Sequence, residues 1–264
     1  MEIRLDGRTA FVSGSTRGIG YGTARLLAES GATVIVNGRD DHAVAQALAS
    51  LRRDVPQATF HGLAADIASP DGADTVARQI QDIDILICNA ATFDWTAFFD
   101  TVDADWQRHF EINVMSGVRL ARAFMKGMLE RNWGRVVLVA SESGLNIPAD
   151  MIHYGVSKAA QIALARGLAE LTAGTGVTVN SVLPGPTASS NSDDFLKNYA
   201  AENDLPLEQA ERHLIDSIRP TSLLRRFATV DEVASMIVYA CSPQASATNG
   251  AALRVEGGML RHPG

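Results

Sequence analysis

Cysteine is scarce in this chain of 264 residues, which contains two of them. Cys88 lies in an apolar run and Cys241 follows an apolar helical pattern, and neither has a second cysteine at the spacing of a metal site. Both are therefore expected to be buried, reduced thiols. A chain of this length buries enough surface to fold without a disulfide or a structural metal, and the sequence predicts no metal site.

Long apolar runs are also missing. None approaches the roughly 20 residues that a membrane-spanning helix needs, and the first residues, MEIRLDGR, lack the apolar core of a signal peptide. These absences predict a cytoplasmic protein that does not contact a membrane.

Positive charge is not in excess. Lys and Arg number 23 against 30 Asp and Glu, a formal net charge of −7. No basic stripe is available to neutralise phosphates, which argues against a nucleic-acid partner. The negative charge is explained more simply by solubility.

What the chain does contain is a regular alternation of β-branched apolar runs and helical patterns. Strands are expected at Thr9–Ser13, Thr33–Asn37, Thr59–Ala64, Ile83–Cys88, Arg135–Ala140, Val177–Val182 and Ala251–Val255. Helices are expected at Ile19–Ser30, Asp41–Arg53, Ser69–Gln81, Asp103–Arg131, Met151–Leu171 and Thr229–Cys241. Alternation of this kind predicts an α/β fold, a Rossmann-like doubly wound sheet of seven parallel strands with helices on both faces. We interpret residues 1–264 as a single domain of this type.

One segment interrupts the alternation. Residues 189–226 are polar, charged and long, and they are expected to form a helical insertion over the edge of the sheet. Such an insertion is either a solvated surface excursion or a lid over a substrate.

A glycine-rich loop follows the first strand. Gly14, Gly18 and Gly20 stand between that strand and the first helix, in the pattern G-x-x-x-G-x-G. Glycines at these positions permit a tight turn and close approach of a ligand, and the helix start offers free N–H groups to a pyrophosphate. A glycine pattern alone is weak, but its strand–turn–helix context indicates a dinucleotide site.

Further motifs follow along the chain. They are Cys88-Asn89-Ala90-Ala91, Asn113 within Ile-Asn-Val, Ser141 after the fifth strand, Tyr154-Gly-Val-Ser-Lys158, Pro184-Gly-Pro-Thr187, Asn249-Gly250 and Gly257-Gly258. With the glycine loop, their order and spacing resemble those of the short-chain dehydrogenase/reductase family over essentially the whole chain. One departure is Ala91, which stands where the family has glycine and adds a methyl group near the expected ribose position.

The Tyr-x-x-x-Lys motif has a direct chemical interpretation. Tyr154 and Lys158 share one face of a helix, and an adjacent ammonium group is expected to lower the phenol pKa from its usual ~10. The resemblance implies that Tyr154 exchanges a proton with the substrate, that Ser141 hydrogen-bonds the substrate oxygen, and that Asn113 holds a water leading to Lys158. Ser143 is expected to touch substrate. His153 either contacts substrate or, more simply, lies partly exposed at the helix start.

The resemblance also implies the residues that hold the cofactor. Asp66 would reach the adenine and Lys158 would also bind the nicotinamide ribose. The full expected set is Gly14, Thr16, Arg17, Gly18, Ile19, Gly20, Arg39, Asp66, Ile67, Asn89, Ala90, Lys158, Pro184 and Thr187.

The end of the second strand indicates which cofactor is used. NAD-binding proteins tend to have an acid there that holds the ribose 2′-hydroxyl. This chain has Gly38 followed by Arg39, and Arg17 lies in the glycine loop, so NADP(H) is expected over NAD(H). Asp40 complicates this prediction, because it either caps the next helix or pairs with Arg39.

Together these features predict an NADP(H)-dependent oxidoreductase that interconverts a carbonyl and a secondary alcohol of a small molecule. Two alternatives remain: an NAD-dependent sugar or polyol dehydrogenase, and a nucleotide-binding sensor without catalysis.

Helix Met151–Leu171 is apolar around nearly its full circumference, and a helix on one sheet face needs only one apolar stripe. A homotetramer or a homodimer is therefore expected.

Overall fold

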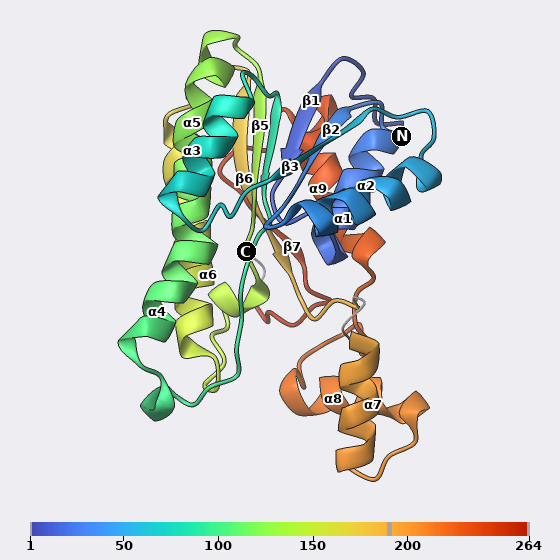
Figure 1. Cartoon of the computed structure of the whole chain (residues 1–264). Helices are drawn as coiled ribbons and strands as arrows, with labels where there is room; N and C mark the ends of the chain where they lie inside the picture. The colour runs from blue at the N-terminus through green and yellow to red at the C-terminus, as the bar shows by residue number, and fades with distance from the viewer. Residues whose placement is uncertain (1, 189–191, 263–264) are drawn as a thin grey trace.

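The computed structural model describes residues 2–188 and 192–262 and contains one parallel sheet (Figure 1). Its strands are β1 (Thr9–Val12), β2 (Thr33–Gly38), β3 (Phe60–Ala64), β4 (Ile85–Cys88), β5 (Gly134–Val139), β6 (Val177–Pro184) and β7 (Ala252–Val255). The order across the sheet is β3-β2-β1-β4-β5-β6-β7, and every pairing is parallel. The predicted doubly wound sheet is confirmed, and its order reverses between β1 and β4.

Helices cover both faces of this sheet. They are α1 (Gly18–Glu29), α2 (Asp41–Asp54), α3 (Pro70–Gln79), α4 (Asp103–His109), α5 (Ser116–Glu130), α6 (Ile152–Glu170), α7 (Ser192–Glu202), α8 (Leu207–Ile218) and α9 (Val230–Cys241). Several begin at side-chain caps: Asp40 accepts a hydrogen bond from the Ala43 N–H, and Thr229 forms a capping box with Glu232.

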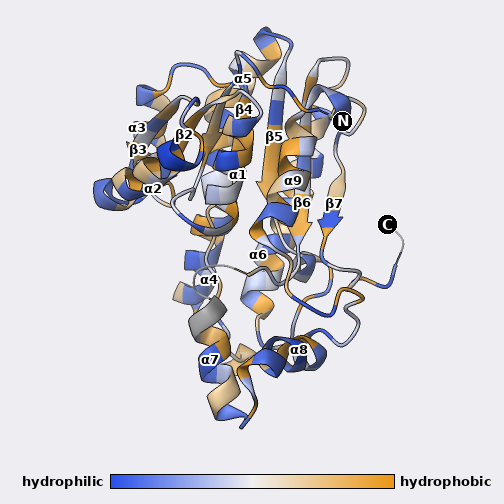
Figure 2. Ribbon diagram, turned by 90° about the vertical axis from the view of Figure 1, so that its right-hand side faces the viewer, coloured by the Kyte–Doolittle hydropathy of each residue, from blue (hydrophilic) through white to orange (hydrophobic). Residues whose placement is uncertain are grey.

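Two hydrophobic cores lie on the two faces of the sheet because successive strand residues point to opposite sides. Ala10 and Val12 of β1 pack in one core with α1, α2 and α9, whereas Phe11 packs in the other with α3, α5 and α6. The central strands are accordingly mostly apolar, as the orange of β5 shows (Figure 2). Cys88 and Cys241 are buried and unpaired, as expected, and burial raises the pKa of each thiol to about 12.

The long helix predicted over Asp103–Arg131 is correct in extent but is not regular. A π-helical turn, Phe110–Met115, separates α4 from α5 and includes Asn113. Apolar periodicity does not distinguish one wide turn from an α-helix, so the sequence could not reveal it. π turns are often found at functional sites.

The predicted insertion forms α7 and α8, which lie beyond the carboxyl ends of the strands (Figures 1 and 2). A small apolar cluster of Leu214, Ile215 and Phe227 holds the two helices together with partly buried neighbours. Residues 189–191 of the predicted segment lie outside the described residues. No helix in the described part of the chain is long and apolar enough to span a membrane.

Candidate active site

The glycine loop has the backbone that its composition predicts. Gly14 and Gly18 have φ angles of 60° and 57°, which L side chains rarely adopt. A Cβ atom on Gly20 would lie 2.4 Å from the carbonyl oxygen of Gly14, so this packing also requires glycine. Helix α1 begins at Gly18 without a side-chain cap, and its free N–H groups can therefore hold an anion.

Polar side chains behind this loop hold it in place. The Ser13 hydroxyl accepts hydrogen bonds from the N–H groups of Asn89 and Ala90, at 2.9 and 3.1 Å. The Asn89 side-chain amide donates to the carbonyls of Ser13 and Gly14, at 3.0 Å each. Asn37, at the end of β2, accepts from the Gly14 N–H at 3.3 Å and donates to the carbonyls of β3. The roles of Ser13 and Asn37 could not be predicted from the sequence, because polar residues at the ends of apolar strands show their role only when the strands are paired.

The predicted adenosine end of the site lies where β2 and β3 finish. Gly38 is buried and Thr16 packs against it; a Cβ atom on Gly38 would lie 2.6 Å from the Thr16 methyl carbon. Arg39 is exposed, and the side chain of Asp40 caps α2 and does not pair with Arg39. Asp66 is exposed just after β3, whose last residue pairs with Gly38. These residues and the glycine loop therefore lie together at the carboxyl ends of the strands.

Other residues predicted to bind the cofactor lie around the same ends of the strands. Ile19 is partly buried in the first turn of α1, and Ile67 is buried after β3. Pro184 ends β6, and Thr187 forms an isolated β-bridge with Ala228. These last two lie at the carboxyl end of β6, two strands beyond the point where the sheet order reverses.

Tyr154, Lys158 and Ser141 lie close together in the structure. The Lys158 Nζ atom lies 5.7 Å from the centroid of the Tyr154 ring and donates to the Val139 carbonyl and to Gln161, at 2.9 and 2.8 Å. Lys158 is buried, and Ser141, at the end of β5, is 8% exposed.

Burial changes the acid–base properties of this pair. It raises the pKa of Tyr154 to about 12, although a hydrogen bond with Ser141 acts in the opposite direction. It lowers the pKa of Lys158 to about 7. The predicted lowering of the phenol pKa by Lys158 is therefore not found in the protein alone: desolvation raises this pKa, and the groups that lower it are Ser141 and Arg219.

Asn113 lies in the π turn, where its side chain connects three segments. Its Oδ1 atom accepts from the Thr92 N–H at 2.8 Å, and its Nδ2 donates to the Thr92 carbonyl and to Ser157, at 3.0 and 2.8 Å. Its amide thus fixes the loop after β4 to helix α6. The water predicted at Asn113 would need a different group, such as its main-chain carbonyl.

Ser143 is buried in an ion-pair network that the sequence did not reveal. Its hydroxyl donates to Glu142 at 3.0 Å and accepts from Arg219 at 3.2 Å. Arg219 follows α8 and also pairs with Glu142 at 2.7 Å. Glu142 is buried, and its Oε2 atom has no hydrogen-bond partner among the described residues. This network connects the insertion to the segment that carries Ser141.

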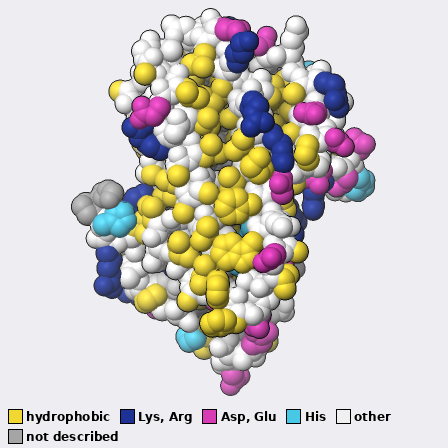
Figure 3. Space-filling model, turned by 90° about the vertical axis from the view of Figure 1, so that its left-hand side faces the viewer, with side chains coloured by type: hydrophobic (Ala, Val, Ile, Leu, Met, Phe, Trp, Pro, Cys, Tyr) yellow, Lys and Arg dark blue, Asp and Glu magenta, His cyan; other side chains and the backbone are white. Residues whose placement is uncertain are grey.

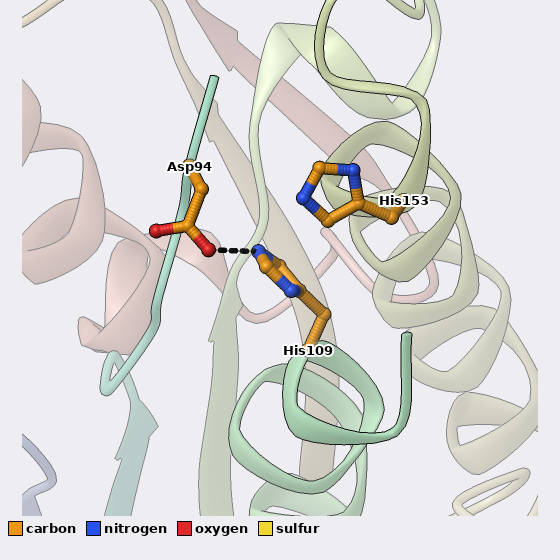
Figure 4. Close-up of side chains that lie close together, drawn as sticks. All are labelled: Asp94, His109 and His153. Carbon is orange, nitrogen blue, oxygen red and sulfur yellow. Dashed lines mark ion pairs between the residues drawn. The ribbon is translucent and has the colours of Figure 1, made fainter. Parts of the chain in front are cut away.

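His153 differs from the simpler expectation. It is 1% exposed, not partly exposed, because α4 packs over the start of α6. Its ring contacts that of His109, with centroids 4.3 Å apart, and Asp94 lies beside His109 (Figure 4). Asp94 and His109 were not predicted as site residues, since their separation in sequence matches no motif.

Aromatic side chains cover the entrance to Tyr154. The Phe93 ring lies 6.2 Å from that of Tyr154 and 5.6 Å from that of Trp95. Trp95 stacks on Phe195 of α7, with centroids 5.7 Å apart and planes 6° from parallel. The insertion therefore contacts the site from two sides, through Phe195 and through Arg219.

The chain is similar in sequence to known oxidoreductases. The family model described as Enoyl-(Acyl carrier protein) reductase matches residues 14–260. An uncharacterized oxidoreductase of Bacillus subtilis is 39% identical over 261 residues, which are 99% of each chain. A D-beta-hydroxybutyrate dehydrogenase of Cupriavidus necator is 33% identical over 97% of this chain and 99% of its own.

A solved structure agrees closely with the fold. It is L-sorbose reductase from Gluconobacter frateurii in complex with NADPH and L-sorbose, which has a TM-score of 0.93 and 28% identity, covering 99% of this chain and 100% of its own. The fold and these similarities define an oxidoreductase with an NAD(P)-binding Rossmann fold. The chain belongs to the short-chain dehydrogenase/reductase family, as its motifs predicted.

Proposed function

We propose that this protein is an NADP(H)-dependent oxidoreductase that interconverts a carbonyl and a secondary alcohol, with Tyr154 as the residue that exchanges the proton. The proposal rests mainly on one observation. Tyr154, Ser141 and Lys158 lie close together, and they lie at the carboxyl ends of the strands, where the glycine loop also lies. The tight packing around Gly14 and Gly20 and the uncapped start of α1 support a dinucleotide phosphate site at this loop.

Each of these side chains has a distinct task in the proposal. The nicotinamide, when bound, supplies or accepts the hydride at the substrate carbon. Tyr154 gives its proton to the carbonyl oxygen during reduction and takes it back from the hydroxyl during oxidation. Ser141 donates a hydrogen bond to that oxygen, and Lys158 stabilises negative charge on Tyr154. The glycine loop, with Asn89 and Ala90 behind it, would hold the cofactor phosphates.

The preference for NADP(H) rests on two arginines. Arg17 and Arg39 are both exposed at the edge where the adenosine ribose is expected, and neither side chain has an ion-pair partner within residues 2–188 and 192–262. Asp40 is engaged at the start of α2. Both guanidinium groups can therefore meet a 2′-phosphate. The bound NADPH of the similar L-sorbose reductase supports this choice.

A second candidate narrows the substrate to a hydroxylated carbonyl such as a ketose. The supporting observation is the buried Oε2 atom of Glu142, an acceptor without a partner in the described residues next to Ser141. A substrate hydroxyl would satisfy it. Helices α7 and α8 would then act as a lid, held by Phe195 and Arg219, over a small polar molecule.

The assembly is proposed to be a homotetramer or a homodimer. The buried side of α6 is partly polar, with Ser157, Lys158 and Gln161, whereas Ala163 and the adjoining Leu171 are exposed. Hydrophobic side chains gather on the face of the molecule that carries α4, α5 and α6 (Figure 3). A second copy is the simplest cover for an apolar surface of this extent.

One set of assays tests the proposed function. Ketones, ketoses, steroids and acyl thioesters are screened with NADPH and with NADH, and kcat/KM is then measured on the best substrate for wild type, Tyr154→Phe and Arg39→Ala. Tyr154→Phe should lose about 10²–10⁴-fold in kcat and keep cofactor binding, because one hydroxyl is removed. Arg39→Ala should lose preference for NADPH.

Two results would contradict the proposal. Wild-type turnover by Tyr154→Phe would remove the proton role from that residue. A wild type that prefers NADH, or an Arg39→Ala variant that keeps its NADPH preference, would favour the NAD-dependent sugar or polyol dehydrogenase. Absence of turnover with every substrate, together with tight nucleotide binding, would favour a sensor.

A further inference from the structure

Three side chains from separate elements converge next to Tyr154 but take no part in the proposed proton transfer. Asp94 belongs to the loop after β4, His109 is the last residue of α4, and His153 stands in the first turn of α6 (Figure 4). One ligand-type atom from each lies within 4.8 Å of the other two, and His109 Nε2 is 3.8 Å from Asp94 Oδ2.

The two imidazoles are buried with unused nitrogen atoms. His109 and His153 are 0% and 1% exposed. His109 Nε2 and both ring nitrogens of His153 have no hydrogen-bond partner within the described part of the chain. Buried polar atoms are nearly always satisfied, so His109 Nε2 and one ring nitrogen of His153 indicate a missing partner that these two atoms share.

The tautomer of His109 shows what kind of partner is missing. Its Nδ1 atom lies 2.8 Å from the Asp105 carbonyl oxygen, which can only accept, so Nδ1 carries the hydrogen. In the neutral ring Nε2 then directs a lone pair toward the Asp94 carboxylate. Two electron-pair donors thus lie 3.8 Å apart, with no hydrogen between them. The Arg108 guanidinium donates to the same Asp94 oxygen at 2.6 Å but does not contact His109 Nε2, and a cation bound between His109 and Asp94 would remove the conflict.

The surroundings are those of a metal-binding histidine. A ligating imidazole usually donates its other N–H to a carbonyl or carboxylate, as His109 does. A ligating carboxylate is usually hydrogen-bonded as well, and Arg108 donates to Asp94 at 2.6 Å. Two imidazoles and one carboxylate suit Zn²⁺, whose ligand atoms lie about 3.3 Å apart in a tetrahedral site. The ligand atoms now lie within 4.8 Å of one another, so metal binding would bring them closer together by up to about 1.5 Å.

We propose that Asp94, His109 and His153 form a binding site for a divalent transition metal ion, with Zn²⁺ the best match, separate from the predicted nucleotide site. Three protein ligands leave a fourth position for water or another small ligand. A bound metal would fix the loop after β4 to α4 and α6. Because Phe93 is next to Asp94 in this loop and contacts Tyr154, the metal would also hold the Phe93 ring in place beside Tyr154.

Metal binding is tested on the full-length, tag-free protein after treatment with a chelator, in the absence of nucleotide and substrate. Zn²⁺ is titrated by calorimetry and Co²⁺ by visible absorption. Wild type should bind one equivalent of Zn²⁺, and Co²⁺ should produce the absorption of a tetrahedral complex. Asp94→Asn and His109→Gln should bind about tenfold more weakly or worse.

Asp94→Asn keeps the volume of a partly exposed side chain, so it should fold even if the change at buried His109 does not. His61→Gln, which alters an exposed imidazole on β3, is the matched control and should bind as wild type does. Zn²⁺ should also raise the Tm of wild type and His61→Gln but not of Asp94→Asn.

Equal Zn²⁺ binding by wild type and Asp94→Asn, or no binding by wild type at micromolar concentrations, would overturn the proposal. In that case His109 and Asp94 form a simple ion pair. Since no step of the test uses nucleotide or turnover, its outcome is independent of the proposed oxidoreductase activity.

Discussion

Burial has opposite effects on the protons of Tyr154 and Lys158. It raises the pKa of the phenol to about 12 and lowers that of the ammonium to about 7. At neutral pH the protein alone therefore keeps Tyr154 protonated, which is the state that reduction requires. In the oxidation direction the phenolate is needed, and the positive nicotinamide of the oxidised cofactor would favour it.

The lowered pKa of Lys158 leads to a prediction about stability. Its pKa in the folded protein, about 7, is below the ordinary value of 10.5 expected for the unfolded chain. Between these values the unfolded chain holds more protons, so the free energy of unfolding rises with pH. This site should add about 2 kcal/mol between pH 7 and pH 9.

Urea unfolding of the nucleotide-free protein at pH 7 and pH 9 measures this increment. Lys158→Met should lose it, whereas Lys126→Met, a change at an exposed lysine of α5, should retain it. If both variants and wild type show the same pH dependence, Lys158 is not the group responsible and its ammonium is not strongly desolvated.

At the scale of elements, the strands and most helices could be predicted from sequence. Most strands are short runs rich in β-branched residues, and the strand predicted at Val177–Val182, for example, ends within two residues of the end of β6. Gly14, Tyr154 and Lys158 could be proposed as site residues from the sequence because their motifs are defined by local spacing. The local sequence pattern is sufficient to predict a helix or strand when the residues that define the element are close together in the chain.

Most of the features that the sequence did not reveal depend on contacts between residues that are distant in the chain. His153 is buried only because α4 packs on α6, and Glu142 meets Arg219 across 77 positions of the chain. The π turn at Asn113 is one wide turn within a regular apolar pattern. None of these leaves a periodic signal, so a single sequence cannot show them.

The ion pair between Arg219 and Glu142 is predicted to stabilise the fold. The Arg219 and Glu142 side chains are 13% and 2% exposed, so removing Arg219 leaves a buried, unpaired carboxylate. Arg219→Met should lower the free energy of unfolding by about 3 kcal/mol. Arg212→Met, which breaks an exposed ion pair within α8, should change it by less than about 1 kcal/mol.

Chemical denaturation of the two variants compares these losses directly. In Arg219→Met with Glu142→Gln, stability should partly recover, because the buried charge is gone. An Arg219→Met variant as stable as Arg212→Met would show that α8 is not anchored to the segment carrying Ser141, and the lid would then need another attachment.

At the scale of the whole molecule, the proposed assembly depends on the outer surface of α6. The helix sends Lys158 and Gln161 toward the sheet and leaves Ala163 exposed in its middle. A small exposed residue on an apolar helix allows close approach of an identical helix about a twofold axis. A glutamate at that position would place two like charges opposite each other in the contact.

Light scattering after size exclusion should therefore give wild type two or four times the 28.2 kDa mass of one chain. Ala163→Glu should shift the protein to a smaller species, because an unpaired charge is costly to bury in an interface. Ala201→Glu, at an exposed position of α7, adds the same charge away from α6 and should leave the mass unchanged. A wild type that is monomeric at micromolar concentration would contradict the assembly, and Ala163→Glu with the wild-type mass would place the interface on another face.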